Sequence, residues 1–329
     1  MRITVLGAGS WGTTVASLVA RRHETILWAR DAEVAKTIAT EHVNPLYLPG
    51  FTLTPKLAAT SDIEEATCGA DLLVVGVPSS GFRRALVDAA PHMRPWIPVV
   101  SLAKGLESGS MLRMTEVIKE VAPGHPVAAL TGPNLAHEIM AGKAAASVIA
   151  TEDLEVARAI QKVFTRGVFR VYLNDDVVGC EMGGALKNVI AIAAGIGEGL
   201  GVGDNTRAGV MSRGLAELTR LGVAMGARAT TFAGLAGMGD LIATCMSHYS
   251  RNRAVGEQLG KGRRLEDVLA EMHMVAEGVR TASVALELAR PHQLDLPICT
   301  VIDRVIAGEI EPKDAYWGLT PAGHEAEPG

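Results

Sequence analysis

Lys187 is the side chain whose type and surroundings best suit proton transfer in this 329-residue chain. If its segment, ALKNVIAIAAGI, is helical, the residues three and four positions away are all small or apolar. These neighbours are Gly183, Gly184, Ile190 and Ala191. Burial among such residues lowers the pKa of a lysine towards the range in which it exchanges protons near neutral pH. A lysine that extends to the surface, or pairs with Glu181, is the alternative.

Asp240 is an acidic residue in a glycine-rich, apolar stretch, AGLAGMGDLIATC, and Thr244 lies one helical turn beyond it. An unpaired carboxylate in such surroundings is costly to bury, so Asp240 needs a partner. Lys187 is a candidate for that partner. A simple helix N-cap is the other role open to Asp240.

The segment Ser250-Arg251-Asn252-Arg253 supplies a group of hydrogen-bond donors suited to a phosphate dianion. The alternative is a pair of ordinary surface arginines. Lys104 follows a predicted strand, and the loop TGPN from Thr131 follows the next one. Because ligands bind at the carboxyl ends of parallel strands, both loops are candidate binding segments. A solvated loop lysine is the alternative for Lys104.

Three glycines, Gly7, Gly9 and Gly12, form a G-x-G-x-x-G pattern between a predicted strand and a predicted helix. Glycine there permits a tight turn, the approach of the backbone to a pyrophosphate, and close helix–strand packing. The helix N-terminus adds free N–H groups. A purely structural turn is the alternative. Arg30 and Asp31 end the second strand, where an arginine accepts the 2′-phosphate of NADP and an acid binds the ribose of NAD. The pair favours NADPH, with NADH also accepted.

The elements that must position these residues alternate in the first half of the chain as strands and helices, which is typical of a parallel sheet. We predict a Rossmann-like α/β domain over residues 1–175. Its strands are predicted at 3–6, 25–28, 71–77, 98–101, 127–130, 144–150 and 168–172. Its helices are predicted at 10–22, 82–90, 110–121 and 153–164.

Strand patterns stop after about residue 176, and the second half has helical lengths and periodicity. We predict an all-α domain over residues 176–321 and a flexible tail over 322–329. Its helices are predicted at 178–198, 208–225, 251–259, 265–272, 276–289 and 299–307.

The composition excludes several classes of protein. Hydrophobic residues make up 48% and charged residues 20%, which excludes disorder as the main state. A net charge of −5 gives no general attraction to nucleic acid or to acidic membranes. The four cysteines form no CxxC pair and the nine histidines no HExxH, so we expect neither a disulfide scaffold nor a metal site. The uncharged run 3–20 contains three glycines, which argues against a signal or membrane helix; we expect a cytoplasmic protein.

Seven motifs together resemble those of bacterial NAD(P)-dependent glycerol-3-phosphate dehydrogenases. They are GAGSWGTTVA, AKGLE, TGPNLAHEI, ALKNVIAIAAGI, AGLAGMGDLIATC, SRNR and VAEGVRTA. They occur in the order found in the family, and the resemblance covers the chain from residue 1 to about 320. The resemblance implies interconversion of dihydroxyacetone phosphate and sn-glycerol 3-phosphate by hydride transfer, which supplies the backbone of phospholipids.

The resemblance also implies roles for single residues. Lys187 is the expected proton donor and acceptor, with Asp240 and Thr244 holding it and Lys104 adding positive charge. The positions expected to bind the phosphorylated substrate are Lys104, Gly132, Asn134, Lys187, Asp240, Ser250, Arg251 and Asn252. Those expected to bind NADPH or NADH beside the glycine turn are Ser10, Trp11, Arg30, Lys104, Ala136, Arg251, Val275 and Glu277. We expect Lys104, Lys187 and Arg251 to converge in one crevice, and the chain to form a homodimer.

Two residues depart from the family pattern. Asn134 stands where a serine or threonine is more usual, and Asp31 where a polar or basic residue often follows the arginine. Three other functions compete with this one. A related dehydrogenase of 3-hydroxy acids would hold a carboxylate instead of a phosphate. A serine acyl-enzyme is suggested by Ser101-x-x-Lys104 but lacks a K-T-G triplet. A nucleotide-sensing regulator would bind the coenzyme without turnover.

Overall fold

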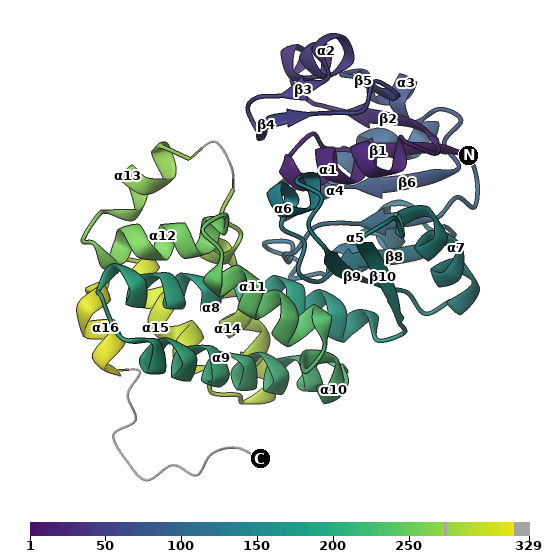
Figure 1. The fold of residues 1–329 in the computed structure, drawn as a ribbon. Helices are drawn as coiled ribbons and strands as arrows, with labels where there is room; N and C mark the ends of the chain where they lie inside the picture. The colour runs from purple at the N-terminus through teal and green to yellow at the C-terminus, as the bar shows by residue number, and fades with distance from the viewer. Residues whose placement is uncertain (273–274, 319–329) are drawn as a thin grey trace. The chain divides into compact units, whose positions relative to one another are not determined.

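The computed structural model describes residues 1–272 and 275–318 and divides the chain into two compact units, Met1–Glu181 and Met182–Gly329 (Figure 1). The first unit is an α/β domain and the second is helical. The division falls inside one long helix, α8 (Val177–Gly199). The expected tail, 322–329, lies outside the described residues.

The first unit is built on an eight-stranded sheet with the order β10-β9-β8-β7-β6-β1-β2-β5. All neighbouring strands are parallel except β8 and β9, which are antiparallel. The strands are β1 (Arg2–Leu6), β2 (Glu24–Trp28), β5 (Leu57–Thr60), β6 (Leu72–Val75), β7 (Val99–Ser101), β8 (Val127–Thr131), β9 (Ala145–Ala150) and β10 (Phe169–Asn174). A short antiparallel hairpin, β3 (Val43–Asn44) with β4 (Leu48–Thr52), lies outside this sheet.

Both faces of the sheet are covered by helices, so its central strands are apolar on both sides. Within β6, Leu73 packs into the core that contains Phe82, whereas Val74 packs into the core that contains Val15. This alternation follows the period of two of a strand. The helices of the unit are α1 (Ser10–Val19), α2 (Ala32–Glu41), α3 (Ile63–Thr67), α4 (Ser79–Ala89), α5 (Met114–Val121), α6 (Ala136–Met140) and α7 (Leu154–Phe164).

The helix predicted at 110–121 begins only at Met114. Met111 has a positive φ of 60°, and Leu106 forms an isolated antiparallel bridge with Arg113. The chain therefore turns back on itself before the helix starts. The helix α2 was not predicted, because only Ala35 and Ile38 of its ten residues are buried. The short elements α3, α6, β3, β4 and β5 were not predicted either, because their apolar patterns are too brief to distinguish from a loop.

The second unit surrounds α8, in which every residue from 179 to 197 is buried. The other helices are α9 (Asp204–Ala224), α10 (Ala229–Phe232), η2 (Leu235–Gly239), α11 (Asp240–Met246), α12 (Arg251–Gly260), α13 (Leu265–Ala270), α14 (Gly278–Ala289), α15 (Pro297–Ile306) and α16 (Pro312–Gly318). Two stretches are long and apolar enough to cross a membrane, Val177–Gly199 and Ala229–Met246. The apolar window of the first is 94% buried and that of the second 44%. The first is therefore a core helix.

The backbones of helices α8 and α12 are in contact. A Cβ added to Gly195 or Gly199 of α8 would lie within 3.0 Å of a carbonyl oxygen of α12. A Cβ added to Gly256 or Gly260 of α12 would lie equally close to a carbonyl oxygen of α8. Each helix thus presents two glycines four residues apart to the other. We call these four residues the glycine crossing.

Glu217 joins α9 to α15. Its carboxylate accepts hydrogen bonds from the backbone N–H groups of Ile298, at 2.8 Å, and Cys299, at 3.3 Å. These two groups lie in the first turn of α15, where backbone donors lack partners within the helix. Burial raises the pKa of Glu217 to about 7, although the two N–H groups oppose the shift.

We predict that the free energy of unfolding falls between about pH 5 and pH 8 through Glu217. The folded protein binds this proton more tightly than the unfolded chain does, so stability decreases as pH rises from 4.5 towards 7. The contribution is about 3 kcal/mol at most. Denaturant titrations across this range should show a flatter pH dependence in Glu217→Gln than in the wild type. Glu287→Gln, at an exposed position of α14, is the control; equal slopes in all three proteins would contradict the prediction.

Candidate functional site

The glycine turn between β1 and α1 has the shape that a pyrophosphate requires. Gly7 has a φ of +107°, and a Cβ there would lie 2.9 Å from the carbonyl group of Gly76. A Cβ on Gly12 would collide with the carbonyl oxygen of Gly7. A Cβ on Gly9, by contrast, would have no other atom within 4 Å. Gly9 is the N-cap of α1 and has no side chain to cover the first N–H groups of Ser10 and its successors. The turn therefore leaves space and donors for a dinucleotide.

Trp11 offers a second feature that fits a dinucleotide. Its Nε1 atom is buried and has no hydrogen-bond partner among the described residues. Its ring packs edge-on against Phe169 of β10, with ring centroids 6.1 Å apart. Buried donors are nearly always paired in folded proteins, so an acceptor supplied by a bound coenzyme fits this position.

Arg30 and Asp31 differ in what their side chains do. Asp31 caps α2, because its carboxylate accepts from the backbone N–H groups of Glu33, at 2.9 Å, and Val34, at 3.3 Å. Arg30 is exposed. The departure from the family pattern at Asp31 thus has a structural role as a helix cap.

Lys104 and the loop after β8 lie together in the first unit. The Lys104 ammonium donates to the carbonyl oxygen of Gly132 at 2.6 Å, and Gly132 has a φ of +110°. Asn134 accepts from the hydroxyl of Ser147 through Oδ1, while its Nδ2 is buried with no partner in the described part of the chain. Asn134 therefore offers a donor where a serine or threonine would offer a hydroxyl. Ala136 is the first residue of α6.

Lys187, Asp240 and Thr244 form a buried group in the second unit. The Lys187 ammonium donates to the Asp240 carboxylate and, at 2.5 Å, to the Thr244 hydroxyl. Lys187 is 4% exposed and Asp240 1%. A Cβ on Gly183 would lie 2.7 Å from the carbonyl oxygen of Ala236, so α8 approaches η2 closely, directly before Asp240. Asp240 uses its side chain on this lysine and is not the cap of α11, whose N-cap is Gly239.

Glu181, the other acid considered for Lys187, is held elsewhere. It accepts from the backbone N–H of Thr115 at 2.9 Å and from the Arg113 guanidinium at 2.9 Å. The thiol of Cys245 lies close enough to Lys187 and Asp240 for the charges of both residues to affect its pKa. Burial raises the pKa of Cys245 to about 12 although the charge of Lys187 opposes this. Cys245 is therefore a neutral part of the wall beside Lys187.

The four residues at the start of α12 make different contacts. Ser250 caps the helix by accepting from the backbone N–H of Arg253 at 3.2 Å. Arg253 is buried and its guanidinium bonds Glu198 and Glu257, so it is not the phosphate donor that the sequence suggested. The side chain of Arg251 forms no hydrogen bond or ion pair within residues 1–272 and 275–318. Partial burial lowers the pKa of Arg251, and the nearby carboxylate of Glu277 opposes that shift.

Asn252 is fixed by two hydrogen bonds. Its Nδ2 donates to Oδ1 of Asn188 at 2.9 Å, and its Oδ1 accepts from the backbone N–H of Gly278 at 2.9 Å. Asn188 follows Lys187 directly and was missed by sequence reasoning, although its adjacency to that lysine was a usable signal. Glu277 precedes α14, and Val275 is 37% exposed.

The predicted residues thus form two groups. The glycine turn, Lys104, Gly132 and Asn134 belong to the first unit, and Lys187, Asp240, Thr244 and the start of α12 belong to the second. The convergence of Lys104, Lys187 and Arg251 in one crevice stays a prediction.

Both halves of the chain match models of one protein family. Residues 2–157 match the NAD-dependent glycerol-3-phosphate dehydrogenase N-terminus, and residues 176–316 match the NAD-dependent glycerol-3-phosphate dehydrogenase C-terminus. A relative from Sphingopyxis alaskensis, glycerol-3-phosphate dehydrogenase [NAD(P)+] 2, is 57% identical over 100% of this chain and 99% of its own. A relative from Mycobacterium tuberculosis, glycerol-3-phosphate dehydrogenase [NAD(P)+] 1, is 51% identical over 98% of this chain and 96% of its own.

Solved structures show the same similarity. The crystal structure of glycerol-3-phosphate dehydrogenase from Coxiella burnetii has a TM-score of 0.93 and 33% identity, covering 97% of this chain and 98% of that one. A PanE/ApbA family ketopantoate reductase from Ralstonia eutropha has a TM-score of 0.63 and 18% identity, covering 96% of this chain and 100% of that one. The second likeness concerns the fold alone.

Proposed function

The chain belongs to the NAD-dependent glycerol-3-phosphate dehydrogenases, and on that premise we propose that Lys187 exchanges the proton of the reaction. The enzyme reduces dihydroxyacetone phosphate reversibly to sn-glycerol 3-phosphate with NADPH or NADH, a step of glycerophospholipid synthesis. A dehydrogenase of 3-hydroxy acids is not favoured. The observation that carries the proposal is the buried contact of the Lys187 ammonium with Asp240 and Thr244.

The proposed mechanism gives each member of this group one task. Bound NAD(P)H supplies the hydride that reaches the carbonyl carbon. Lys187 gives one N–H proton to the oxygen that becomes the alcohol, and is left as a neutral amine. The Asp240 carboxylate favours the charged lysine before the step, and the Thr244 hydroxyl accepts from the same nitrogen and limits its rotation. Reprotonation of the amine completes the cycle, and oxidation runs these transfers in reverse.

Positive charge near the developing alkoxide is the second contribution that we propose. The ammonium of Lys104, directed by its hydrogen bond to Gly132, is a fixed donor of the first unit. A fixed donor aimed at such an oxygen is worth roughly 3 kcal/mol of transition-state stabilisation. The buried Nδ2 of Asn134 is a donor suited to another substrate oxygen.

Substrate anchoring is assigned to the start of α12. Arg251 has a guanidinium suited to a phosphate dianion. The hydrogen bonds of Asn252 to Asn188 and Gly278 hold the first turn of α12 in place. Binding energy gained at the phosphate then positions the carbonyl group for reaction.

We predict that Arg251→Ala raises the KM for dihydroxyacetone phosphate at least 10-fold, because the dianion loses its guanidinium partner. Initial rates should be measured with saturating NADPH and, in parallel, NADH. Arg264→Ala is the control, since Arg264 is an exposed arginine of the same unit that pairs with Asp267. An unchanged KM in Arg251→Ala would refute the anchoring role.

The use of NADPH is supported by the end of β2. The carboxylate of Asp31 caps α2 and is therefore engaged by backbone N–H groups. The exposed Arg30 is then the residue suited to a 2′-phosphate. We further propose that the glycine turn of the first unit is the main binding site of the coenzyme, and that the second unit carries the proton donor and the phosphate anchor for the substrate. The homodimer and the cytoplasmic location stay predictions from the sequence.

A further inference from the structure

A cluster of cations in the first unit lies outside every residue assigned above. It consists of Arg21 and Arg22 after α1, Lys162 in the last turn of α7, Arg166 after α7, and Arg170 in β10. None of the five forms an ion pair with an acid among residues 1–272 and 275–318. By contrast, the neighbouring Arg158 of α7 pairs with Glu155 at 2.7 Å. A basic residue near the C-terminus of a helix can be explained by its interaction with the helix dipole. That interaction does not explain why five cations gather without an acidic partner.

A hollow of about 590 Å³ opens among these cations. Arg22, Lys162 and Arg170 line it together with Thr165 and Tyr172, and no acidic residue does so. The hydroxyl of Thr165 and the Nη1 atom of Arg166 are buried and have no hydrogen-bond partner in the described part of the chain. Burial and the charges of Arg21 and Arg22 lower the pKa of Arg166, so the positive charges act on one another. Arg166 does not itself line the hollow, but an anion bound there would offset the repulsion among the positive charges and could accept from the Thr165 hydroxyl.

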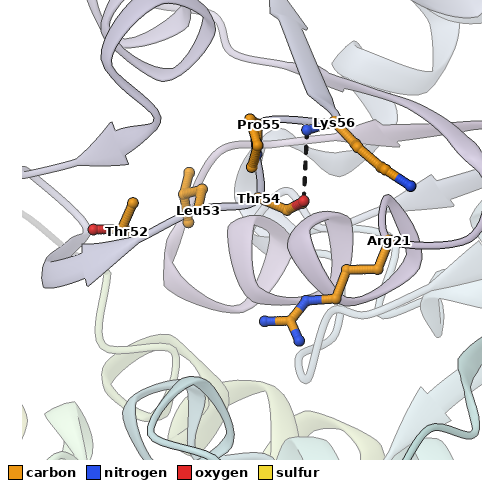
Figure 2. A pocket seen from close by; sticks show the side chains of 6 residues that line it. All are labelled: Arg21, Thr52, Leu53, Thr54, Pro55 and Lys56. Atoms are coloured by element: carbon orange, nitrogen blue, oxygen red, sulfur yellow. Dashed lines mark hydrogen bonds between the residues drawn. The ribbon is translucent and has the colours of Figure 1, made fainter.

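A second hollow nearby lacks these properties. Figure 2 shows its lining residues, with Arg21 and Lys56 as the two cations. Its volume is about 350 Å³, and the hydroxyl of Thr54 already accepts from the backbone N–H of Lys56 at 3.5 Å. We therefore place the ligand in the larger hollow.

We propose that the hollow between α7, β10 and the end of α1 binds a small anion that carries at least two phosphate groups, at a site separate from the coenzyme and substrate sites. Two or more phosphates match the three lining cations, and guanidinium groups bind phosphate in a bidentate manner. The ring of Tyr172, which is 53% exposed, borders the hollow and offers a stacking face. The shared chemistry is the polyphosphate, whose source is either a free inorganic anion or a nucleoside diphosphate.

The site adjoins an element that reaches the glycine turn. Arg170 follows Phe169, whose ring packs on Trp11. A ligand on Arg170 thus contacts the strand that supports Trp11, without touching the coenzyme residues themselves.

The test is calorimetric titration of the full-length protein with pyrophosphate and, separately, with ADP. Saturating NADH and glycerol 3-phosphate keep the active-site region filled without turnover. We expect one site per chain with a micromolar Kd. The double variant Lys162→Ala/Arg170→Ala should weaken binding at least 10-fold, while Arg158→Ala changes it less than twofold. Both substituted side chains are exposed, and unchanged thermal unfolding checks that the fold is retained.

Tyr172→Ala distinguishes the two sources. Weaker binding of ADP with unchanged pyrophosphate binding identifies a nucleotide, and unchanged binding of both identifies an inorganic anion. Absence of saturable binding, a stoichiometry well above one, or equal losses in the double variant and Arg158→Ala would overturn the proposal. Because the readout is binding and not turnover, it stands or fails independently of the role of Lys187.

Discussion

Replacing Lys187 by alanine is expected to lower kcat for dihydroxyacetone phosphate reduction by about three orders of magnitude. The variant loses both the general acid, worth 10²–10⁴-fold, and a positive charge next to the developing alkoxide. Binding of NADH should persist, because the glycine turn belongs to the first unit and does not include this residue. Steady-state rates together with fluorescence titration of NADH measure the two effects separately.

The control for Lys187→Ala must account for Asp240. Removing the ammonium leaves a carboxylate buried without its cation, which costs about 3–5 kcal/mol of stability. The double variant Lys187→Ala/Asp240→Asn removes that charge and should recover stability but not turnover. Lys119→Ala, an exposed lysine paired with Glu152, is a neutral comparison. Added methylamine should restore part of the activity if the missing group is an acid; near-normal turnover in the folded variants would rule out the assignment.

Gly256→Ala is expected to destabilise the protein by about 3 kcal/mol and to raise the KM for substrate. The new methyl group meets the carbonyl oxygen of Ile192 on α8, and a backbone atom cannot move aside as a side chain can. The helices must separate, which breaks the hydrogen bond of Asn252 to Asn188 and moves the neighbouring Arg251. Denaturant titration and initial-rate kinetics on the same preparation measure both changes.

Gly209→Ala is the matched control for this substitution. Gly209 is an exposed residue of α9, and an added Cβ meets no atom within 4 Å. Alanine is favoured over glycine in a helix interior, so this variant should gain up to about 1 kcal/mol. If Gly256→Ala gave the same gain, the glycine crossing would not be a close contact.

Local patterns predicted the elements that are long or strictly periodic. The apolar run around β6 and the glycine turn before α1 both have signals within a few residues, and the structure has a strand and a helix there. The Lys187–Asp240 pair could be predicted for another reason. Each residue is the charged residue of an apolar stretch, so each needs a partner of opposite charge.

Other features depended on contacts between distant segments. Arg251 and Arg253 look equivalent in SRNR, yet only Arg253 meets Glu198 and Glu257. Which of the two arginines meets these acids depends on which side of α12 faces α8. The local sequence pattern does not indicate that side. The cap at Asp31 was missed because helix α2, which buries only Ala35 and Ile38, was not predicted.

The glycine crossing has a consequence for which molecules the enzyme accepts. Lys187 lies on α8 and Arg251 on α12, and the crossing joins these helices through peptide groups that have no rotamers to change. The distance between the proposed acid and the proposed phosphate anchor is therefore fixed, and it sets the distance between carbonyl and phosphate in an accepted substrate. A phosphorylated ketone with one more carbon between its carbonyl and its phosphate would have to fit the same length. We expect selection among such compounds to depend on chain length more than on the polarity of the rest of the molecule.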